Sequence, residues 1–454
     1  MSSEVDASAG FIQSLCGEFE KHNHIDPAHY ERWDVKRGLR NADGTGVMAG
    51  VTQIGNVLGY YVQDGERNPM PGKLIYRGIN VEDLITGFMS EDRFGFEETA
   101  YLLLFGALPT RSQLDLFRQT LTLHHALPPM FTEDMILKAP SPDVMNKLGR
   151  SILSLYSYDE NPEDKSLEGE LTKAISLIAQ VPTIVAHAFA AKRHYYNDES
   201  LYLHRPQAGL SVAENFLYSV RHDNRFTKEE ARLLDLCLVL HAEHGGGNNS
   251  AFACRVLSSS GTDIYSAIAA AVGSLKGPRH GGANKKVMEM FGYIEEAVPC
   301  WTDEGALRDY LAKLLRKEAG DGSGLIYGMG HAIYTLSDPR AVILKRFAKD
   351  LAVQKGMGEE FALFETVERL TPEVLAGSGQ PKIVCANVDF YSGLVYKMMG
   401  IPQELYTPLF AVARMVGWCA HRIEEVYNPG NKIIRPAYKA VAPQLDFVPL
   451  DKRG

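Results

Sequence analysis

The sequence has few cysteines, and none of them is spaced for a metal site or a disulfide framework. Its 454 residues include six cysteines and no C-x-x-C pair, a pattern that indicates reduced thiols and argues against a disulfide scaffold or a zinc ribbon. Basic residues are also in deficit, with 47 Lys+Arg against 56 Asp+Glu. A protein that coats nucleic acid normally has a basic surplus, so the composition argues against that class and leaves room only for a local basic site.

Long apolar runs are missing as well. Residues 1–10 contain two acids and no apolar run, unlike a secretory signal or an Arg-rich transit peptide. The longest weakly polar stretch, residues 175–191, is interrupted by Gln180, Pro182 and His187. It falls short of the roughly 20 apolar residues that span a membrane, so a buried helix is expected. We therefore expect a cytoplasmic protein without membrane or nucleic-acid partners.

Helical periodicity dominates the rest of the chain. Residues 39–78 hold most of the turn signals and β-branched or aromatic runs, which predict one or two small hairpins. No repeat of 20–50 residues occurs, so a solenoid is not supported. The expected fold is mainly α, with helices near 97–105, 111–124, 142–156, 167–190, 212–219, 227–244, 250–257, 263–275, 284–297, 304–319, 341–353, 359–369, 388–399 and 408–426.

Two histidines continue the apolar stripes of the helix expected over residues 227–244, which begins with a T-x-x-E capping box. His244 would lie in the last turn, where the helix C-terminus favours an imidazolium that could bind a small carboxylate. Two other interpretations of His241 and His244 stay open. They could be core histidines bonded to carbonyl groups, or the H-A-E-H spacing could be a weak metal-binding pattern.

Two further histidines lie in glycine-rich loops, where the backbone can approach a ligand closely. His280, within residues 277–284, precedes a predicted helix whose N-terminus disfavours the charged ring, so a neutral His280 could donate an N–H to an enolate. His331 lies nine residues before Arg340, and the pair could polarise and clamp a small anion. The Asp-Pro before Arg340 also fits a helix start.

Asp389 and Arg414 complete the set of candidates. Asp389 lies where a helix is expected to begin, so it is either a helix cap or, in a dry site, a general base. Arg414 lies between two aromatic residues on one face of a helix and could bind a carboxylate in a partly dehydrated site. His421 and Glu425 continue that face, and we expect them to be solvated or to face another subunit.

These motifs together resemble the citrate synthase family over nearly the whole chain. Several ordered motifs are far more specific than any one of them. The matching segments are residues 74–78, 100–106, 241–248, 277–284, 328–332, 338–340, 387–393, 414–421 and 435–436.

The resemblance implies an all-α homodimer with a large domain, residues 1–280 and 389–454, and a small domain, residues 281–388, that closes over the substrates. The implied reaction condenses acetyl-CoA with oxaloacetate and hydrolyses the citryl thioester to citrate and CoA, which makes the chain an acyltransferase at the entry of the tricarboxylic acid cycle. The alternative is 2-methylcitrate synthase using propionyl-CoA, because one methyl group changes discrimination by only about 1–3 kcal/mol.

The resemblance also implies residue roles. Asp389 would remove the methyl proton of acetyl-CoA, His280 would donate a hydrogen bond to the enolate oxygen, and His331 would polarise the ketone and protonate the new alkoxide. No metal or cofactor is implied, since acetyl-CoA is a substrate. The remaining implied contacts are His244, Arg340, Arg414 and the partner subunit's Arg435 for oxaloacetate, and the backbone of Leu325, Ile326, Tyr327, Gly328, Met329 and Gly330 for CoA.

Two positions depart from the family pattern. Thr335 stands where a basic residue usually contacts a CoA phosphate, so Lys382 or an N-terminal arginine would have to substitute. Met329 stands where an aromatic residue is common, which affects the shape of the CoA loop. Neither departure touches the acid–base set, which argues against a non-catalytic helical scaffold. A metal-dependent hydrolase built on His241, Glu243 and His244 is the least favoured alternative.

Overall fold

The computed structural model describes residues 2–64, 66–379, 383–428, 430 and 432–453, and for residues 2–11 the backbone alone. It divides into two units, Met1–Gly50 with Arg435–Gly454, and Val51–Ile434. Every predicted site residue except Arg435 belongs to the second unit. The boundaries expected for a small domain, residues 281–388, fall inside that unit and stay a prediction.

The terminal unit consists of short helices and extended chain. It contains α1 (Ser2–His22), α2 (Ala28–Arg32) and the 3-10 turns η1 (Arg37–Leu39) and η5 (Leu450–Lys452). The helix α1 was not predicted from the sequence. Large apolar side chains are exposed in the C-terminal segment of this unit: Tyr438 is 94% exposed, and Leu445 and Phe447 are each 82% exposed.

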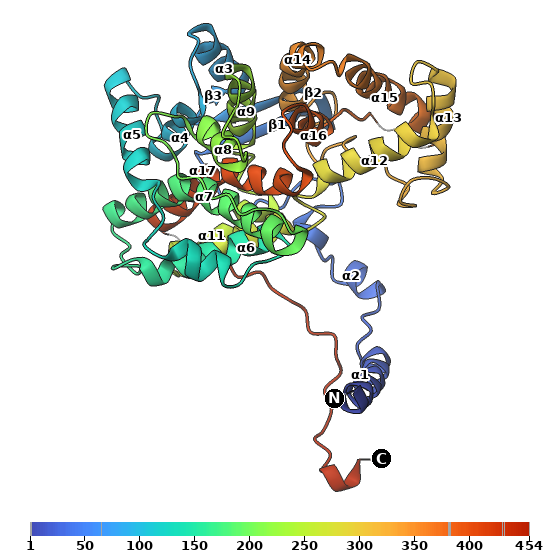
Figure 1. Cartoon of the computed structure of the whole chain (residues 1–454). Helices are drawn as coiled ribbons and strands as arrows, with labels where there is room; N and C mark the ends of the chain where they lie inside the picture. Colours follow the sequence, from blue (N-terminus) through green and yellow to red (C-terminus); the bar gives the residue numbers. More distant parts are fainter. Residues whose placement is uncertain (1, 65, 380–382, 429, 431, 454) are drawn as a thin grey trace. The chain divides into compact units, whose positions relative to one another are not determined.

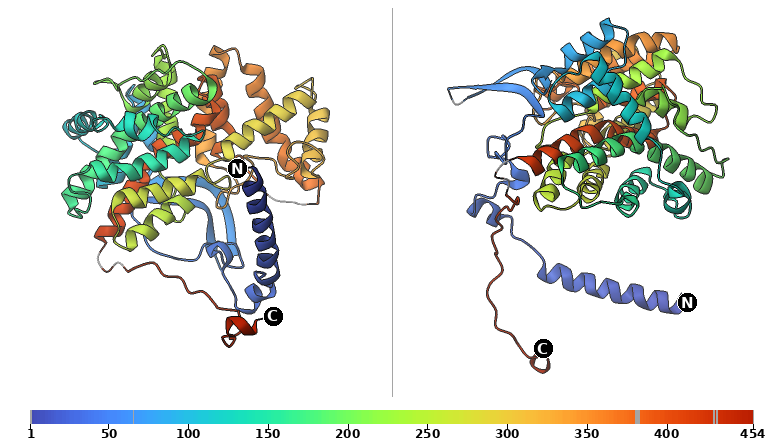
Figure 2. Two further views of the ribbon diagram at one scale, coloured as in Figure 1. Left: turned by 60° about the horizontal axis from the view of Figure 1, so that its bottom comes forward. Right: turned by 90° about the vertical axis from the view of Figure 1, so that its left-hand side faces the viewer.

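The sheet of the second unit is a three-stranded antiparallel meander in the order β1 (Gly55–Gln63), β2 (Glu66–Tyr76) and β3 (Ile79–Asn80). Gly55 pairs with Tyr76, and the register shifts between Leu58 and Tyr60. This confirms the hairpin expected within residues 39–78. The far end of the β1–β2 hairpin projects beyond the helices in the right-hand view of Figure 2.

Helices form the rest of the unit, as the periodicity predicted (Figure 1). The helix α3 was not predicted. The helices are α3 (Val81–Ser90), α4 (Phe96–Phe105), α5 (Arg111–His124), α6 (Val144–Leu155), α7 (Leu167–Asn197), α8 (Val212–Val220), α9 (Lys228–His241), α10 (Asn249–Ser259), α11 (Ile264–Lys276), α12 (Ala283–Ala297), α13 (Glu304–Leu315), α14 (Pro339–Gln354), α15 (Gly358–Gly377), α16 (Val388–Met398) and α17 (Tyr406–Tyr427), with shorter turns η2 (Thr132–Leu137), η3 (Tyr156–Tyr158) and η4 (Gln403–Leu405).

Two helices make the centre of the core. The helix α7 is long and apolar enough to cross a membrane by length and composition, but 78% of its most apolar window is buried inside the protein, as expected for residues 175–191. The helix α17 packs against α4, α7, α9, α10 and α11 and is buried at every residue from Pro408 to Arg422. His421 is therefore 0% exposed, and the expectation that it would be solvated or face another subunit was wrong.

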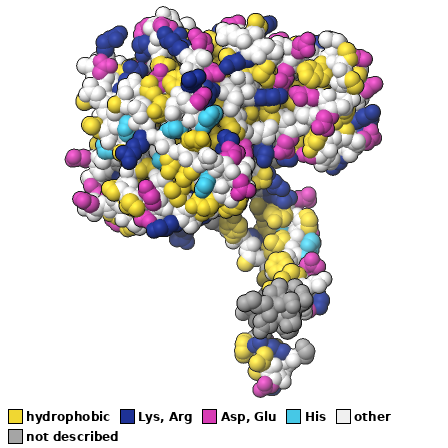
Figure 3. Space-filling view, viewed as in Figure 1, with side chains coloured by type: hydrophobic (Ala, Val, Ile, Leu, Met, Phe, Trp, Pro, Cys, Tyr) yellow, Lys and Arg dark blue, Asp and Glu magenta, His cyan; other side chains and the backbone are white. Residues whose placement is uncertain are grey.

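The surface carries charges of both signs. On the face shown in Figure 3, acidic and basic side chains are interspersed over the helical unit. The whole chain has a formal net charge of −9, while Arg340 and Arg414, discussed below, are buried.

Candidate active site

His244 lies beyond the end of a helix, where the sequence had placed it in the last turn. The helix α9 ends at His241 and Ala242 caps it. Burial, with the charges of Arg340 and Arg414, holds the pKa of His244 well below its usual range. The predicted imidazolium was wrong, because desolvation outweighs a terminal dipole worth about 1 kcal/mol. His244 is a neutral ring, and its buried Nε2 has no hydrogen-bond partner among the described residues.

The His331 ring is fixed by the backbone of its own loop. Its Nδ1 accepts the N–H groups of Ile333 and Tyr334, each at 3.1 Å. Since Nδ1 is an acceptor, the proton of the neutral ring belongs on Nε2. The ring also stacks on Tyr334 with centroids 4.5 Å apart and meets His244 edge-on at 5.1 Å. His331 therefore presents an N–H donor next to His244.

His280 is held by a serine that the sequence reading missed. Its Nε2 lies 2.9 Å from Ser250 Oγ. That oxygen also accepts the indole N–H of Trp418 at 3.1 Å and lies 3.0 Å from Asn248 Oδ1. Burial, with the charge of Arg414, lowers the pKa of His280 to about 4. The ring is neutral, as expected. The cause is burial, however, and not the helix N-terminus that the sequence had suggested.

Ser250 also controls which nitrogen of His280 carries the proton. A serine hydroxyl has one proton; in the structure it is donated to Asn248 Oδ1 at 3.0 Å, and rotation of the hydroxyl would give it to His280 Nε2 instead. In the second arrangement Nε2 accepts, so Nδ1 carries the N–H that could donate to a substrate oxygen. The only sequence signal for Ser250 was its place two residues after Asn248 of the matching segment.

Arg340 is held by a buried carboxylate. Asp338, at 0% exposure, accepts Nε of Arg340 at 3.0 Å and Nη2 at 2.7 Å. Although burial alone would lower the pKa of Arg340, the charge of Asp338 raises it above its usual value. Asp338 also caps α14, which confirms the helix start expected at the Asp-Pro pair. Its Oδ2 accepts the N–H of Val388 at 3.2 Å, which ties Arg340 to the start of α16.

Arg414 lies in the middle of α17 and is 1% exposed. Its Nε donates to the carbonyl oxygen of His241 at 2.6 Å, and its Cζ lies 4.8 Å from the Phe410 ring centroid. Burial lowers its pKa to about 10, so the guanidinium is charged at neutral pH. Its buried Nη2 has no partner among the described residues. Such a group can bind a carboxylate strongly, because water does not compete for it.

Asp389 lies in the first turn of α16, but Asn387 is the cap: its Oδ1 accepts the N–H of Asp389 at 3.0 Å. The alternative that Asp389 is itself the helix cap was therefore wrong. Burial raises the pKa of Asp389 to about 6, although the charge of Arg340 partly offsets this effect. A carboxyl with a pKa just below neutrality is mostly ionised at pH 7.5 and still basic enough to accept a proton, which suits a general base.

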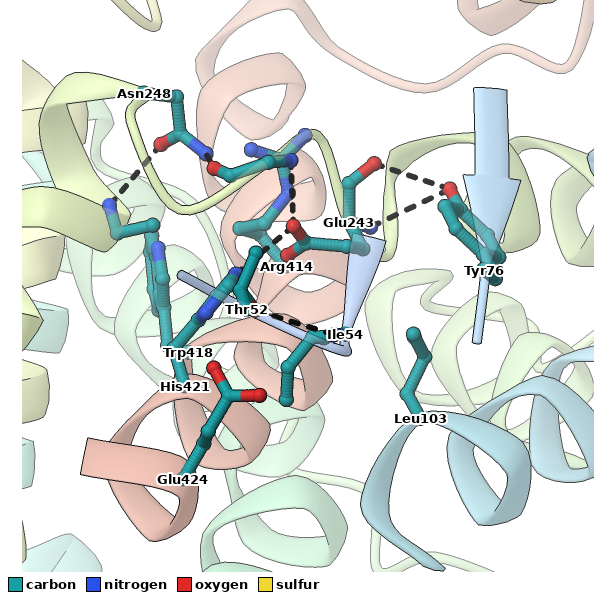
Figure 4. A network of polar contacts seen from close by, with 12 residues as sticks. Thr52, Ile54, Tyr76, Leu103, Glu243, Asn248, Arg414, Trp418, His421 and Glu424 are labelled. Atoms are coloured by element: carbon teal, nitrogen blue, oxygen red, sulfur yellow. Dashed lines mark hydrogen bonds and ion pairs between the residues drawn. The ribbon is translucent and has the colours of Figure 1, made fainter. Parts of the chain in front are cut away.

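A buried polar network surrounds Glu243, the residue before His244 (Figure 4). Glu243 Oε1 accepts His421 Nε2 at 2.9 Å and the N–H of Gly245 at 2.5 Å. His421 Nδ1 in turn accepts Nε of Arg255 at 3.1 Å. Arg255 pairs with Glu425 at 2.7 Å, so Glu425 belongs to this network as well. Glu243 thus braces the loop by hydrogen bonds. Among the described residues, no cluster of three potential metal ligands occurs.

The CoA loop predicted at residues 325–330 is joined to the segment before Asp389. The N–H of Gly330 donates to the carbonyl of Cys385 at 2.8 Å, and the N–H of Asn387 donates to the carbonyl of Gly328 at 2.8 Å. Gly328 has φ of +78°, and a Cβ there would lie 2.9 Å from the Phe390 ring, so only glycine fits. Leu325 is 56% exposed and Ile326 is buried.

Two predicted contacts cannot be placed beside this cluster. Arg435 belongs to the terminal unit and is exposed. Lys382 lies outside the described residues. Thr335 is partly buried, and its Oγ1 has no partner among the described residues.

The structure therefore brings five sequence-distant segments together. Arg340 and Arg414 act electrostatically on both His244 and Asp389, and Arg414 acts on His280 too. Two buried cations, neutral imidazole donors and a carboxylate with a raised pKa can bind a small dianion and move a proton beside it.

Comparison with known proteins gives consistent results. The family described as "Citrate synthase, C-terminal domain" matches residues 42–437. A citrate synthase of Acidithiobacillus ferridurans is 36% identical over 90% of this chain and 97% of its own length. A 2-methylcitrate synthase of Shewanella oneidensis is 33% identical over 84% of this chain and 92% of its own length.

Solved structures agree with this result. The citrate synthase of Thermotoga maritima matches with a TM-score of 0.71 and 32% identity over 92% of this chain and 99% of that one. The enzyme of Thermoplasma acidophilum, solved as a ternary complex with carboxymethyl coenzyme A and oxaloacetate, matches with a TM-score of 0.74 and 24% identity over 92% of this chain and 99% of that one. At that identity the second likeness shows the fold alone.

Proposed function

The chain belongs to the citrate synthase family and is an acyltransferase, and from that premise we propose that Asp389, His280 and His331 carry out its condensation of acetyl-CoA with oxaloacetate. The observation that carries this assignment is the buried set of Arg340, Arg414 and neutral imidazoles around a carboxyl whose pKa is raised to about 6. The oxaloacetate and CoA analogue bound by the Thermoplasma acidophilum enzyme support the choice of substrates.

In the first step, ionised Asp389 takes a proton from the methyl group of acetyl-CoA. The electron pair of that C–H bond forms the enolate, and His280 stabilises its oxygen by donating an N–H, which requires the proton of Ser250 to point to His280 Nε2. A neutral donor suits this role, because a pKa of about 4 keeps the His280 ring uncharged at neutral pH, so it offers a hydrogen bond to the enolate oxygen.

In the second step, the enolate carbon attacks the ketone carbon of oxaloacetate. His331 polarises that ketone through Nε2–H and passes the proton to the new alkoxide, a direction set by the two backbone N–H groups on Nδ1. The carboxylates of oxaloacetate bind to His244, Arg340 and Arg414. Water then attacks the citryl thioester, the C–S bond breaks, and CoA leaves as the thiol. Asp389 and His331 handle the protons of the condensation, and in the hydrolysis the attacking water supplies the hydroxyl group of citrate and the proton of the thiol, so we propose no cofactor.

The backbone of residues 325–330 is proposed to hold CoA, and closure of residues 281–388 to exclude water. A homodimer is proposed as well, in which the partner subunit's Arg435 completes the oxaloacetate site. The exposed Tyr438, Leu445 and Phe447 of the same segment support packing against a second copy.

We also propose a cytoplasmic enzyme of the tricarboxylic acid cycle. All six cysteines are free, which suits a reducing compartment.

The test of the function is release of free CoA from acetyl-CoA by the purified full chain. We expect release only when oxaloacetate is present, and we expect Asp389→Asn to remove most of it. Asp350→Asn is the matched control, because Asp350 is exposed on α14 and should behave like the wild type. The proposal would be refuted if CoA release did not depend on oxaloacetate, or if no CoA were released from either acetyl-CoA or propionyl-CoA.

The second candidate is 2-methylcitrate synthase, favoured by the Shewanella oneidensis relative alone among the comparisons given above. The two activities differ by one methyl group, worth about 1–3 kcal/mol in an apolar site. Measuring kcat/KM for acetyl-CoA and propionyl-CoA ranks them, and a ratio in favour of propionyl-CoA would replace the first assignment.

A further inference from the structure

The β1–β2 hairpin contacts the loop of His244 through one face of its first strand. Gly55, Val57 and Gly59 alternate along β1 and therefore share a face. A Cβ on Gly55 would lie 2.9 Å from Cγ of Glu243. Val57 Cγ2 lies 3.4 Å from where a Cβ on Gly245 would stand. This end of the face packs on the two residues that flank His244.

The other end of the same face packs on the loop of His331. A Cβ on Gly59 would lie 2.4 Å from the carbonyl oxygen of Ile333 and 2.9 Å from Cα of Tyr334. The hairpin register shifts at this point, where Gly59 alone stands opposite residues 70–72 of β2. Ile333 and Tyr334 are the residues whose N–H groups fix His331 Nδ1.

The second strand reaches the same loop at another glycine. A Cβ on Gly72 would lie 2.2 Å from the carbonyl oxygen of Ser337 and 2.6 Å from the Tyr334 ring. The N–H of Gly72 donates to Ser337 Oγ at 3.2 Å. Tyr334 in turn stacks on His331 and meets the edge of His244 with centroids 5.7 Å apart.

We propose that the β1–β2 hairpin is a clasp that sets His331 against His244, with Gly59 and Gly72 as positioning residues for oxaloacetate binding. This inference rests on the proposed function, because oxaloacetate is the ligand assigned to the two histidines. The two rings come from separate loops, and one strand that touches both loops with its backbone fixes their spacing. Any Cβ at these glycines would push a carbonyl of the His331 loop away, and the ring would move with it.

The test is Gly59→Ala in the full chain. We expect kcat/KM for oxaloacetate to fall about 10-fold to 100-fold, because a shift of about 1 Å costs that much in a positioned site. The Kd of oxaloacetate measured by calorimetry should rise, while the KM of acetyl-CoA changes less than about twofold. Gly87→Ala is the matched control, because a Cβ on this glycine of α3 meets no atom within 4 Å.

Ser337→Ala provides a second variant where Gly59→Ala does not fold. It removes only the acceptor of the Gly72 N–H, and we expect a smaller change in the same direction. A lower thermal midpoint with an unchanged oxaloacetate Kd, or equal losses for both substrates, would assign the glycines a structural role and overturn the clasp. Wild-type protein without oxaloacetate-dependent CoA release would instead overturn the proposed function, so the two failures are distinguishable.

Discussion

Replacing Asp389 by Asn should make the protein more stable while it removes activity. Burial raises the pKa of this carboxyl from 3.8 to about 6, so its ionisation costs more in the folded chain than in the unfolded chain. A difference of about two pH units corresponds to about 3 kcal/mol. The cost is present in full above pH 6, shrinks as the pH falls through 6, and disappears below 3.8, where the carboxyl is protonated in both states. Asn has a similar shape and does not ionise, so the variant avoids this free-energy cost.

The assay compares thermal midpoints of wild type and Asp389→Asn at pH 7.5 and pH 5.0. Midpoints are preferred to free energies because a chain of this size need not unfold in two states. We expect the thermal midpoint of Asp389→Asn to be higher than that of the wild type at pH 7.5. At pH 5.0 the difference should be about half as large, because ionisation of Asp389 in the wild type still costs about 1.6 kcal/mol. A variant that melts below the wild type at pH 7.5, or a gain that is the same at both pH values, would refute the reasoning.

Asp338→Asn is the matched control, because the same chemical change should have the opposite sign there. Asp338 is 0% exposed and pairs with Arg340 at 2.7 Å. Removing its charge leaves a buried guanidinium without a counter-ion, which costs about 3–5 kcal/mol. We expect a lower thermal midpoint and weaker oxaloacetate binding. An unchanged midpoint would contradict the ion pair as a stabilising contact.

Two further outcomes are expected. The kcat/KM for acetyl-CoA should rise with pH and level off above pH 6, because only ionised Asp389 accepts the proton. At pH 5 we expect a value about tenfold below the plateau. A flat pH profile over that range would argue against Asp389 as the base. Ser250→Ala should lower kcat about 10-fold to 100-fold with little change in the KM of oxaloacetate, because the tautomer of His280 is then unset. Ser250→Thr, which keeps the hydroxyl, should restore most of the rate, and an undiminished kcat in the alanine variant would remove the serine from the mechanism.

Local sequence signals predicted most of the secondary structure. The capping box at Thr227 and Glu230 forms as expected and starts α9, and the Asp-Pro pair starts α14. The hairpin appears within residues 39–78. The helix α3 was not predicted, because it follows β3 with no loop between them: Asn80 ends the strand and caps the helix. No element was predicted between residue 78 and residue 97, so this start signal was missed.

Protonation states were harder to predict, because they depend on neighbours from other segments. His244 was expected to be a cation at a helix end, yet burial and the charges of Arg340 and Arg414, far along the chain, keep it neutral. His421 follows a polar face of its own helix, yet packing by neighbouring helices buries it completely and Glu243 accepts its N–H. The role of Ser250 depends on Trp418, which reaches it from another helix.

The sequence by itself determined the helical fold, the hairpin and the identity of the residues in the predicted site, because these follow from periodicity, caps and ordered motifs along the chain. Only the tertiary structure decided that His244 is neutral, that burial is what keeps His280 neutral, that Asp338 holds Arg340, and that glycines of a distant hairpin pack against the histidine loops. The physical reason is that desolvation and electrostatic fields are sums over all atoms near a group, and most of those atoms belong to segments far away in the sequence.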